Sequence, residues 1–413
     1  MLTDRIIIIT LSLVIILNFG SYQYNVYAQV AANSGALPNT LSSLFNEVKN
    51  SVVQINVLST TINPHLLVSD KPTNVTISSS GSGFIYDNDG HIVTDDHVVK
   101  GSNTITIRFL DGNSYSAKII GEDPYSDLAV LELDPAAIYQ EQSSTPLALA
   151  NSSSVQVGEP VIAIGNPLGL TGSMSQGIIS QINRVKTDAI TGRFLVSGLI
   201  QTDAIITHGN SGGPLIDMNG SVVGVTERGQ PSEEAAISFP GIGFAISSDT
   251  VKRVVPQLIS HGSYQHAWLG VHLIDITPHI AERMGLSISK GVVVEAVTPG
   301  SPAQLQGISA GTKATVIDNM WDLNSDADII IGIDGKQIKD ASDLVNYIDS
   351  KSPGNSVVLH LFRGDKLVHD INLKLGVRPG AGNFTDSLAF SSFSSLSSHQ
   401  IPYDSLQNYY NNN

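Results

Sequence analysis

The sequence contains no cysteine, so disulfide bonds, thiol nucleophiles and thiolate metal sites are all excluded. Positive charge is also scarce, because 22 Lys and Arg residues stand against 37 Asp and Glu residues and give a formal net charge of −15. This balance argues against a nucleic-acid partner, since proteins bind phosphates mainly through Lys and Arg. Only 14% of residues are charged while glycine occurs 37 times, which favours strands and turns over helices.

The N-terminus carries an apolar run that is short for a membrane span. Ile6 to Leu17 is almost wholly apolar, whereas a span needs about 20 residues. Arg5 precedes the run, and Ala28 ends a stretch suited to signal cleavage. Residues 1–28 are therefore predicted as a cleaved signal peptide or, alternatively, as a retained membrane anchor. Both interpretations place the bulk of the chain in an extracytoplasmic location, secreted or on the outer face of the membrane.

Residues 29–262 have a length that suits one large β domain. Residues 29–39 are predicted as a flexible lead, and residues 40–49 as a short helix because their apolar residues recur at helical spacing. Many short alternating strands follow, which is typical of a barrel or sandwich. The polar stretch Ser59 to Ser80 is predicted as a long surface loop. A helix over Thr250 to Ser260 ends at Gly262.

A second, smaller domain is predicted from Tyr264 onward. Strands are expected at Trp268 to Ile274, Gly291 to Val297 and Asp328 to Ile333, with a helix at Ala341 to Asp349. The tail, residues 379–413, is rich in Ser, Asn and Tyr and lacks apolar periodicity, so it is predicted to be disordered.

The stretch His208 to Leu215 places one hydroxyl, that of Ser211, among three glycines. Glycines permit the backbone angles of a tight turn and let amides converge on one point, as a serine nucleophile and its oxyanion site require. The plain alternative is a glycine-rich hairpin with an incidental serine. His97 at the end of one strand and Asp127 before another provide a base and an orienting carboxylate, in the order His, Asp, Ser. Taken singly, each is more simply a surface or turn residue.

Several sequence blocks together resemble the HtrA/DegP family of exported serine proteases, in the same order and over roughly residues 40–378. The blocks are residues 81–100 around His97, 123–130 around Asp127, 163–170, 201–204, 209–215 around Ser211, and 242–246. The resemblance implies a mainly β fold, with a chymotrypsin-like double β-barrel (residues 40–262) followed by a single PDZ domain (residues 264–378).

Carried over residue by residue, the resemblance makes Ser211 the nucleophile, His97 the general base and acid, and Asp127 the carboxylate that orients it. The backbone amides of Gly209, Asn210 and Ser211 match the oxyanion hole, although Asn210 is also simply explained as a turn residue. Such chemistry needs no cofactor and no metal, and the histidines do not cluster with carboxylates at metal spacing in the sequence. Asp95 and Asp96, beside His97, are expected to raise its pKa.

The primary specificity pocket in this fold has its floor about six residues before the serine, which here is Ile205. No acidic residue waits there for Lys or Arg, so a small apolar pocket is predicted, or else Ile205 points into the barrel core. The predicted wall of this pocket is Ile242, Gly243, Phe244 and Ala245.

The second domain has a PDZ-like carboxylate loop, predicted at Trp268, Leu269, Gly270 and Val271. A C-terminal or hydrophobic peptide would add as a strand beside it. The alternative is that Trp268 is only a packing aromatic between the domains.

The predicted function is an exported endopeptidase of protein quality control that cleaves unfolded or damaged proteins after small apolar residues. Two alternatives stay open: a proteolytically idle holdase or peptide-binding scaffold, and a signalling protease that cuts one membrane substrate. The family implies a homotrimer. No nucleic-acid partner is expected, and membrane attachment would run through the N-terminus.

Overall fold

The computed structural model describes residues 40–68, 71–134, 137, 145–166, 172–187, 195–207, 209–227, 241–317, 321–363 and 366–380. The predictions for residues 1–28 and 29–39, and for all but the first two residues of the tail, lie outside these described residues. Within the described part of the chain, no helix has the length and apolar character needed to cross a membrane.

The chain enters through α2 (Leu41–Val48), a helix that begins as the sequence predicts because the Thr40 side chain accepts a hydrogen bond from the Ser43 N–H. The turn η1 (Lys49–Ser51) then leads into a closed barrel with the strand order β1-β2-β3-β6-β5-β4. Its strands are β1 (Val52–Val68), β2 (Lys71–Ile85), β3 (His91–Asp95), β4 (Thr104–Arg108), β5 (Ser114–Asp123) and β6 (Leu128–Leu133). The short helix α3 (Asp96–Val99) follows β3 directly.

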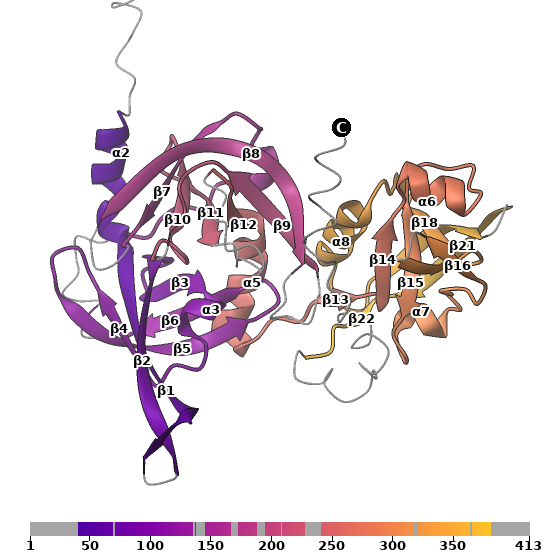
Figure 1. Cartoon of the computed structure of the whole chain (residues 1–413). Coiled ribbons are helices and arrows are strands. Elements are labelled where there is room, and N and C mark those ends of the chain that lie inside the picture. Colours follow the sequence, from indigo (N-terminus) through magenta and orange to yellow (C-terminus); the bar gives the residue numbers. More distant parts are fainter. Residues whose placement is uncertain are drawn as a thin grey trace, which may run out of the picture.

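The prediction of a surface loop over residues 59–80 was wrong. Strands β1 and β2 continue through it as one antiparallel hairpin, paired from Val52 with Phe84 to Val68 with Lys71. The hairpin projects from the barrel in Figure 1. This stretch lacks the alternating apolar pattern that usually signals a strand, so the pairing was not predicted from it.

The second closed barrel has the strand order β10-β11-β12-β9-β8-β7. After the turn η2 (Ser152–Ser154), its strands are β7 (Pro160–Gly165), β8 (Ser173–Thr187), β9 (Leu195–Thr202), β10 (Pro214–Asp217), β11 (Val222–Glu227) and β12 (Gly243–Ser247). The helix α5 (Ser248–His261) then buries one apolar face in a core that both barrels share. Each aliphatic side chain buried there stabilises the fold by about 1.5–3 kcal/mol. Gly262 ends the helix with φ 75°, as predicted.

The C-terminal domain contains a main sheet with the order β14-β15-β18-β20-β21, in which β19 also pairs with β18. Two small sheets of two strands each, β13-β22 and β16-β17, accompany it. Its strands are β13 (Ala267–Trp268), β14 (Val271–Asp275), β15 (Val292–Val297), β16 (Ala314–Ile317), β17 (Trp321–Asn324), β18 (Asp328–Ile333), β19 (Lys336–Gln337), β20 (Ser356–Arg363), β21 (Lys366–Lys374) and β22 (Gly376–Val377). Its helices are α6 (Pro278–Arg283), α7 (Pro302–Leu305) and α8 (Ala341–Asp349). Helix α8 lies on the side that faces β8 and β9 of the second barrel (Figure 1). The predicted class, a mainly β double barrel with a smaller domain behind it, is confirmed.

Candidate active site

Asp127 holds His97 at two points. Its Oδ2 lies 2.6 Å from the ring Nδ1, and its Oδ1 accepts the backbone N–H of His97 at 2.9 Å. His97 sits on α3, and Asp127 occupies the turn between β5 and β6. A carboxylate accepts only, so Nδ1 carries a proton, and in the neutral ring Nε2 is the nitrogen with the free lone pair.

Asp127 takes an unusual backbone conformation, with φ 55°. A non-glycine residue in this left-handed region is uncommon and carries strain unless the surroundings enforce it. Here its carbonyl accepts the Asp96 N–H at 3.0 Å, which ties the residue to the start of α3. The strain is offset by contacts that aim the carboxylate at His97.

Ser211 lies on the turn before β10, in the second barrel, and the first barrel holds this turn in place. The backbone N–H of Ser82 donates to the Ser211 carbonyl at 2.9 Å, and the Ser82 hydroxyl donates to the Gly209 carbonyl at 2.5 Å. The same hydroxyl accepts the Asn166 N–H at 2.9 Å. One side chain therefore fixes the nucleophile loop across the seam between the barrels.

The glycines around Ser211 are required by close packing. A Cβ at Gly212, whose φ is +83°, would lie 2.2 Å from the Thr94 hydroxyl and 3.0 Å from the Asp95 N. A Cβ at Gly81 would lie 2.6 Å from Val98 and 3.1 Å from the Ser211 carbonyl. The residues that flank His97 thus touch the Ser211 loop. No hydrogen bond joins the Ser211 hydroxyl to the His97 ring among the described residues.

The oxyanion donors divide into two groups. The Asn210 N–H donates to the Thr207 carbonyl at 3.1 Å, so it serves the turn. The amides of Gly209, where φ is 99°, and of Ser211 donate to no other described residue. These two N–H groups are therefore the ones available to an oxyanion.

A buried acidic cluster surrounds His97. Asp95 is 0% exposed, and one of its oxygens lies 3.9 Å from the His97 Nδ1. Neither Asp95 oxygen has a hydrogen-bond partner of normal geometry among the described residues. Glu227, at the end of β11, is also buried and acts on Asp95 electrostatically. Glu227 belongs to none of the motifs around His97, Asp127 and Ser211, and its only signal in the sequence is a carboxylate that ends an apolar strand.

These charges shift the pKa values. Burial alone would lower the pKa of His97, but the hydrogen bond to Asp127 and the Asp95 charge outweigh burial and raise it to about 9. Burial, reinforced by Asp127, raises the pKa of Asp95 well above its usual range and that of Asp96 to about 7. The direction for His97 is the one expected from the sequence.

The residues expected to form the specificity pocket fall into two sets. Ile205 and Ile242 are 62% and 54% exposed, which rules out the alternative that Ile205 points into the barrel core. Ala245, in contrast, is completely buried in the second barrel core, since it alternates with Phe244 along β12. A Cβ at Gly243 would lie 2.7 Å from Ile206. The accessible apolar surface is therefore supplied by Ile205 and Ile242, and Ala245 is removed from an open pocket wall.

The expected peptide loop of the C-terminal domain is a tight turn. Gly270 has φ +85°, and a Cβ there would lie 2.1 Å from the Ser301 Cβ. The carbonyls of Leu269 and Gly270 accept the Ala303 and Thr298 N–H groups, while their own amides donate to no other described residue. Trp268 pairs with Gly376 between β13 and β22.

A groove-like pairing of β14 with α8 follows this loop. Val271 begins β14, and the Ala341 N–H at the start of α8 donates to the Asp275 carboxylate at the end of β14, at 2.6 Å. The strand and the helix are therefore tied at the end remote from the loop.

In the described part of the chain, two groups of carboxylates and histidine have ligand atoms within 4.8 Å of one another, although the sequence indicated no such clustering. One is Asp87, Asp89 and His91, and the other is Asp95, His97 and Asp127. In each group a His Nδ1 lies 2.6 Å from an Asp oxygen. Both groups are accounted for by these hydrogen bonds, and we assign no metal to them.

A double β-barrel with a His–Asp pair beside a glycine-flanked serine defines the chymotrypsin-like class of serine peptidase folds. Profiles for known domain families agree: a trypsin-like peptidase domain matches residues 81–225, and a PDZ domain matches residues 267–375.

Related proteins narrow the class further. The "Probable periplasmic serine endoprotease DegP-like" of Bartonella henselae is 36% identical over 78% of this chain and 59% of its own length. "Protease Do-like 1, chloroplastic" of Arabidopsis thaliana is 35% identical over 78% of this chain and 68% of its own. The solved "HtrA-type protease AlgW with decapeptide" superposes with a TM-score of 0.62 at 27% identity, covering 83% of this chain and 100% of that one.

The chain belongs to the HtrA/DegP family of serine proteases, with a chymotrypsin-like double barrel followed by a PDZ domain. It spans about half to three fifths of the length of the bacterial relatives, 59% for the Bartonella henselae protein and 53% for the Brucella suis one.

Proposed function

We propose that the chain is an extracytoplasmic serine endopeptidase that cleaves unfolded or damaged proteins. The observation that carries the proposal is the double hold of Asp127 on His97, next to a loop that presents the Ser211 hydroxyl with two unengaged amides. Membership of a family of serine endoproteases, whose bacterial relatives are named periplasmic, supports both the reaction and the location.

In the proposed reaction, the Ser211 Oγ attacks the carbonyl carbon of the scissile peptide while His97 Nε2 takes the hydroxyl proton. Asp127 keeps the ring in the required tautomer and stabilises the imidazolium. The N–H groups of Gly209 and Ser211 receive the oxyanion, a contribution worth about 10²–10³ in rate per donor. His97 then protonates the leaving amine, and water hydrolyses the acyl-enzyme by the same steps in reverse. No step requires a cofactor.

We place the substrate side chain before the cut against the exposed Ile205 and Ile242, with Gly243 and Phe244 beside them. An apolar surface with no acidic residue at Ile205 favours Val, Ala, Ile or Leu over Lys or Arg. At the PDZ domain, a peptide carboxylate would accept hydrogen bonds from the backbone N–H groups near Leu269 and Gly270, and the peptide would lie along β14 from Val271. The AlgW relative was solved with a decapeptide, which supports a peptide-binding role.

We also propose the wider organisation that the sequence suggests: residues 40–262 as the protease domain, residues 264–378 as the PDZ domain, and residues 1–28 as a signal peptide or anchor. A homotrimer is proposed from the family. The half-buried Leu41 and Phe45 on α2 are apolar side chains available for such contacts.

The test compares the full chain with its Ser211→Ala variant. We expect the native chain to cleave casein and to react with a serine-directed fluorophosphonate, and the variant to do neither. Retention of casein cleavage by Ser211→Ala would contradict the proposal. Casein binding without cleavage by the native chain would instead favour the holdase or peptide-binding scaffold, the second candidate. That candidate is favoured by the missing hydrogen bond between Ser211 and His97. A signalling protease would cleave one membrane protein and leave casein intact.

A further inference from the structure

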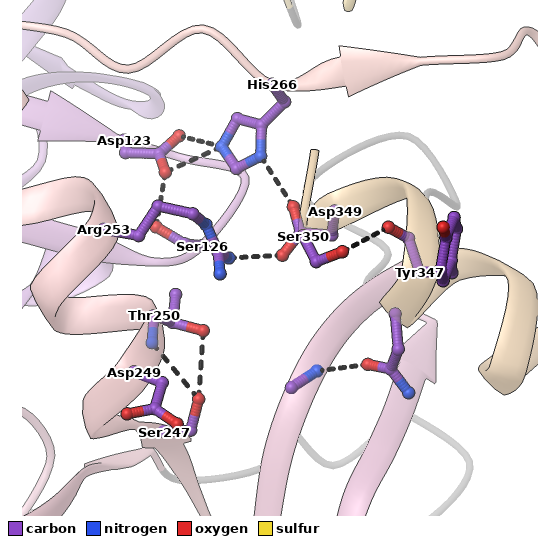
Figure 2. A network of polar contacts seen from close by, with 12 residues as sticks. Asp123, Ser126, Ser247, Asp249, Thr250, Arg253, His266, Tyr347, Asp349 and Ser350 are labelled. Atoms are coloured by element: carbon purple, nitrogen blue, oxygen red, sulfur yellow. Dashed lines mark hydrogen bonds and ion pairs between the residues drawn. The ribbon is translucent and has the colours of Figure 1, made fainter. Parts of the chain in front are cut away.

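His266 lies on the segment between α5 and β13, where the barrels meet the C-terminal domain, and only 5% of it is exposed. Its Nε2 lies 3.0 and 2.8 Å from the two carboxylate oxygens of Asp123. Its Nδ1 lies 3.1 Å from an oxygen of Asp349. Figure 2 shows the ring between these two carboxylates, one from each domain.

This arrangement determines the protonation of the ring. A neutral imidazole has one N–H, so its other nitrogen would direct a lone pair at a carboxylate. With an acceptor on each side, both nitrogens must donate, and the ring is an imidazolium. Burial would lower the pKa of His266, but the hydrogen bonds to Asp123 and Asp349 outweigh burial and raise it to about 9.

Asp349 shows the matching effect. Burial would raise its pKa, but the hydrogen bond from His266 and the charge of Arg253 outweigh burial and lower it to about 2. The Arg253 Nη2 lies 2.5 Å from Asp349. Negative and positive charges thus alternate along a set of four residues, which we call the bridge: Asp123, His266, Asp349 and Arg253.

Two tyrosines and a second arginine complete the surroundings of the ring. Tyr125 and Tyr264 pack edge-on to His266, with ring centroids 5.5 and 4.7 Å away. The Arg378 guanidinium lies over the Tyr125 ring, 4.0 Å from its centroid. The backbone N–H of Arg378 donates to the His266 carbonyl at 2.9 Å. These groups shield the bridge from water and hold the backbone of His266.

On the barrel side, the bridge reaches the catalytic pair through a five-residue turn. Asp123 ends β5, and the turn that it opens ends at Asp127. The Asp123 carboxylate accepts the Tyr125 N–H at 3.2 Å and the Ser126 hydroxyl, so it organises the turn from within. His266 therefore binds Asp123 at the start of this turn, and Asp127 at the end of the same turn binds His97.

On the other side, the bridge reaches α8. Asp349 is the last residue of that helix. One turn earlier, the Asn346 side chain accepts the Gly198 N–H at 2.8 Å and donates to the Asn183 carbonyl at 3.1 Å. A cavity of about 140 Å³ lies beside these contacts, lined by Asn346 and Asp349 on α8 and by Asn183 and Gly198 on the barrel. The helix that borders the proposed peptide groove is thus fastened to the barrel by a few polar contacts, of which the bridge is the charged one.

We propose that His266 is a positioning residue that couples the docking of α8 to the orientation of Asp127, so that a change in the peptide groove and a change in the catalytic pair are linked through one imidazolium. The catalytic half of this inference rests on the proposed function. The structural half, a doubly protonated ring that holds α8 on the barrel, does not.

The structural half is tested first, by ¹⁵N NMR of the His266 ring in the full chain. Both nitrogens are expected to carry protons at pH 7, with loss of one proton only as the pH rises through about 9. Above that pH the segment between α5 and β13 should become sensitive to limited proteolysis. A neutral ring at pH 7 would overturn the proposal without any bearing on whether the chain is a peptidase.

The catalytic half is tested with His266→Gln, Asp349→Asn and the control His261→Gln, which alters an exposed histidine at the end of α5. The two bridge variants are expected to lose about tenfold in kcat with little change in KM, and the double variant to lose no more than either, because all three break one linkage. The control should match the native chain.

Asp349→Asn guards against simple misfolding, since it leaves the barrel sequence intact, and thermal unfolding of each variant is measured alongside. Unchanged kcat and pH profile in both bridge variants would overturn the coupling. An inactive native chain that nevertheless shows the doubly protonated ring would contradict the proposed function and leave the bridge standing.

Discussion

The carboxylate of Asp127 binds His97 through the ring and through the backbone, at 2.6 and 2.9 Å. Rotation of the ring would break the Nδ1 contact, while the backbone contact keeps the carboxylate beside the ring. His97 is therefore positioned by one side chain, and the residue that carries it, Asp127, has an uncommon backbone conformation.

Asp127→Asn should reduce kcat by about 10³–10⁴-fold, because an amide can offer its N–H to Nδ1 and so stabilise the wrong tautomer. Peptide hydrolysis under saturating substrate measures the loss. Asp111→Asn, in the exposed turn after β4, is the matched control and should change little. A loss below tenfold would show that Asp127 does not orient the base.

Asp95→Asn should move the rising limb of the pH–rate profile to lower pH. His97 acts as a base only when neutral, so activity rises with pH through its pKa of about 9, and the Asp95 charge helps to keep that pKa high. Asp96→Asn should shift the limb less, since Asp96 is not among the charges that act on the ring. Identical profiles for all three proteins would contradict this electrostatic account.

Asp96→Asn should stabilise the fold at neutral pH and not at pH 4. The pKa of Asp96 is raised to about 7 in the folded state, mainly by burial, so folding loses stability as the pH rises from about 4 to 7 and the unfolded chain ionises first. Removing the carboxyl group should restore a few kcal/mol, roughly, at pH 7 and above. Urea unfolding at pH 4, 5.5 and 7.5 measures the difference, and a gain independent of pH would refute it.

Ile205→Asp should convert the preference from Val toward Lys and Arg before the cut. The Ile205 side chain is exposed, and a carboxylate there would pair with a basic side chain, raising kcat/KM for the Lys peptide by about tenfold or more. A matched series of Val and Lys peptides gives the ratio. Val157→Asp, at a similarly exposed site, is the control. Faster cleavage after Lys by the native chain would overturn the pocket assignment.

Gly270→Ala should abolish binding of C-terminal peptides. The new methyl would meet Ser301 at 2.1 Å, so the carboxylate loop must open. Gly285→Ala is the control, because Gly285 has a similar φ of +65° but nothing within 4 Å of a new Cβ. Both variants should carry about 1 kcal/mol of backbone strain, because each places an alanine at a positive φ. Titration calorimetry with the peptide should show loss of binding in Gly270→Ala only.

The parts of the molecule that could be predicted from sequence were those whose signals are local. The capped helix α2 and the Gly262 stop follow from residues that are neighbours in the chain, whereas the double barrel was implied by the resemblance to the HtrA/DegP family. The His266 bridge could not be predicted, because its partners lie 143 and 83 residues away. The β1–β2 hairpin was not predicted because the sequence of its outer half lacks the alternating apolar pattern that signals a strand.

The burial of Ala245 could not be predicted either, because it depends on how β12 is oriented in the barrel. A sequence block shows that four residues are consecutive, whereas the pleat of β12 decides which of them face inward. The exposed Ile205 and the buried Ala245 were therefore equivalent in the sequence and are opposite in the fold.

Ser82 sits in one barrel and clasps two carbonyls of the turn that carries Ser211 in the other. A nascent chain that has completed only its first barrel holds the clasp without the turn, and a fragment with only the second holds the turn without the clasp. The turn that carries Ser211 therefore gains its full set of hydrogen bonds only when both barrels have folded and closed on each other.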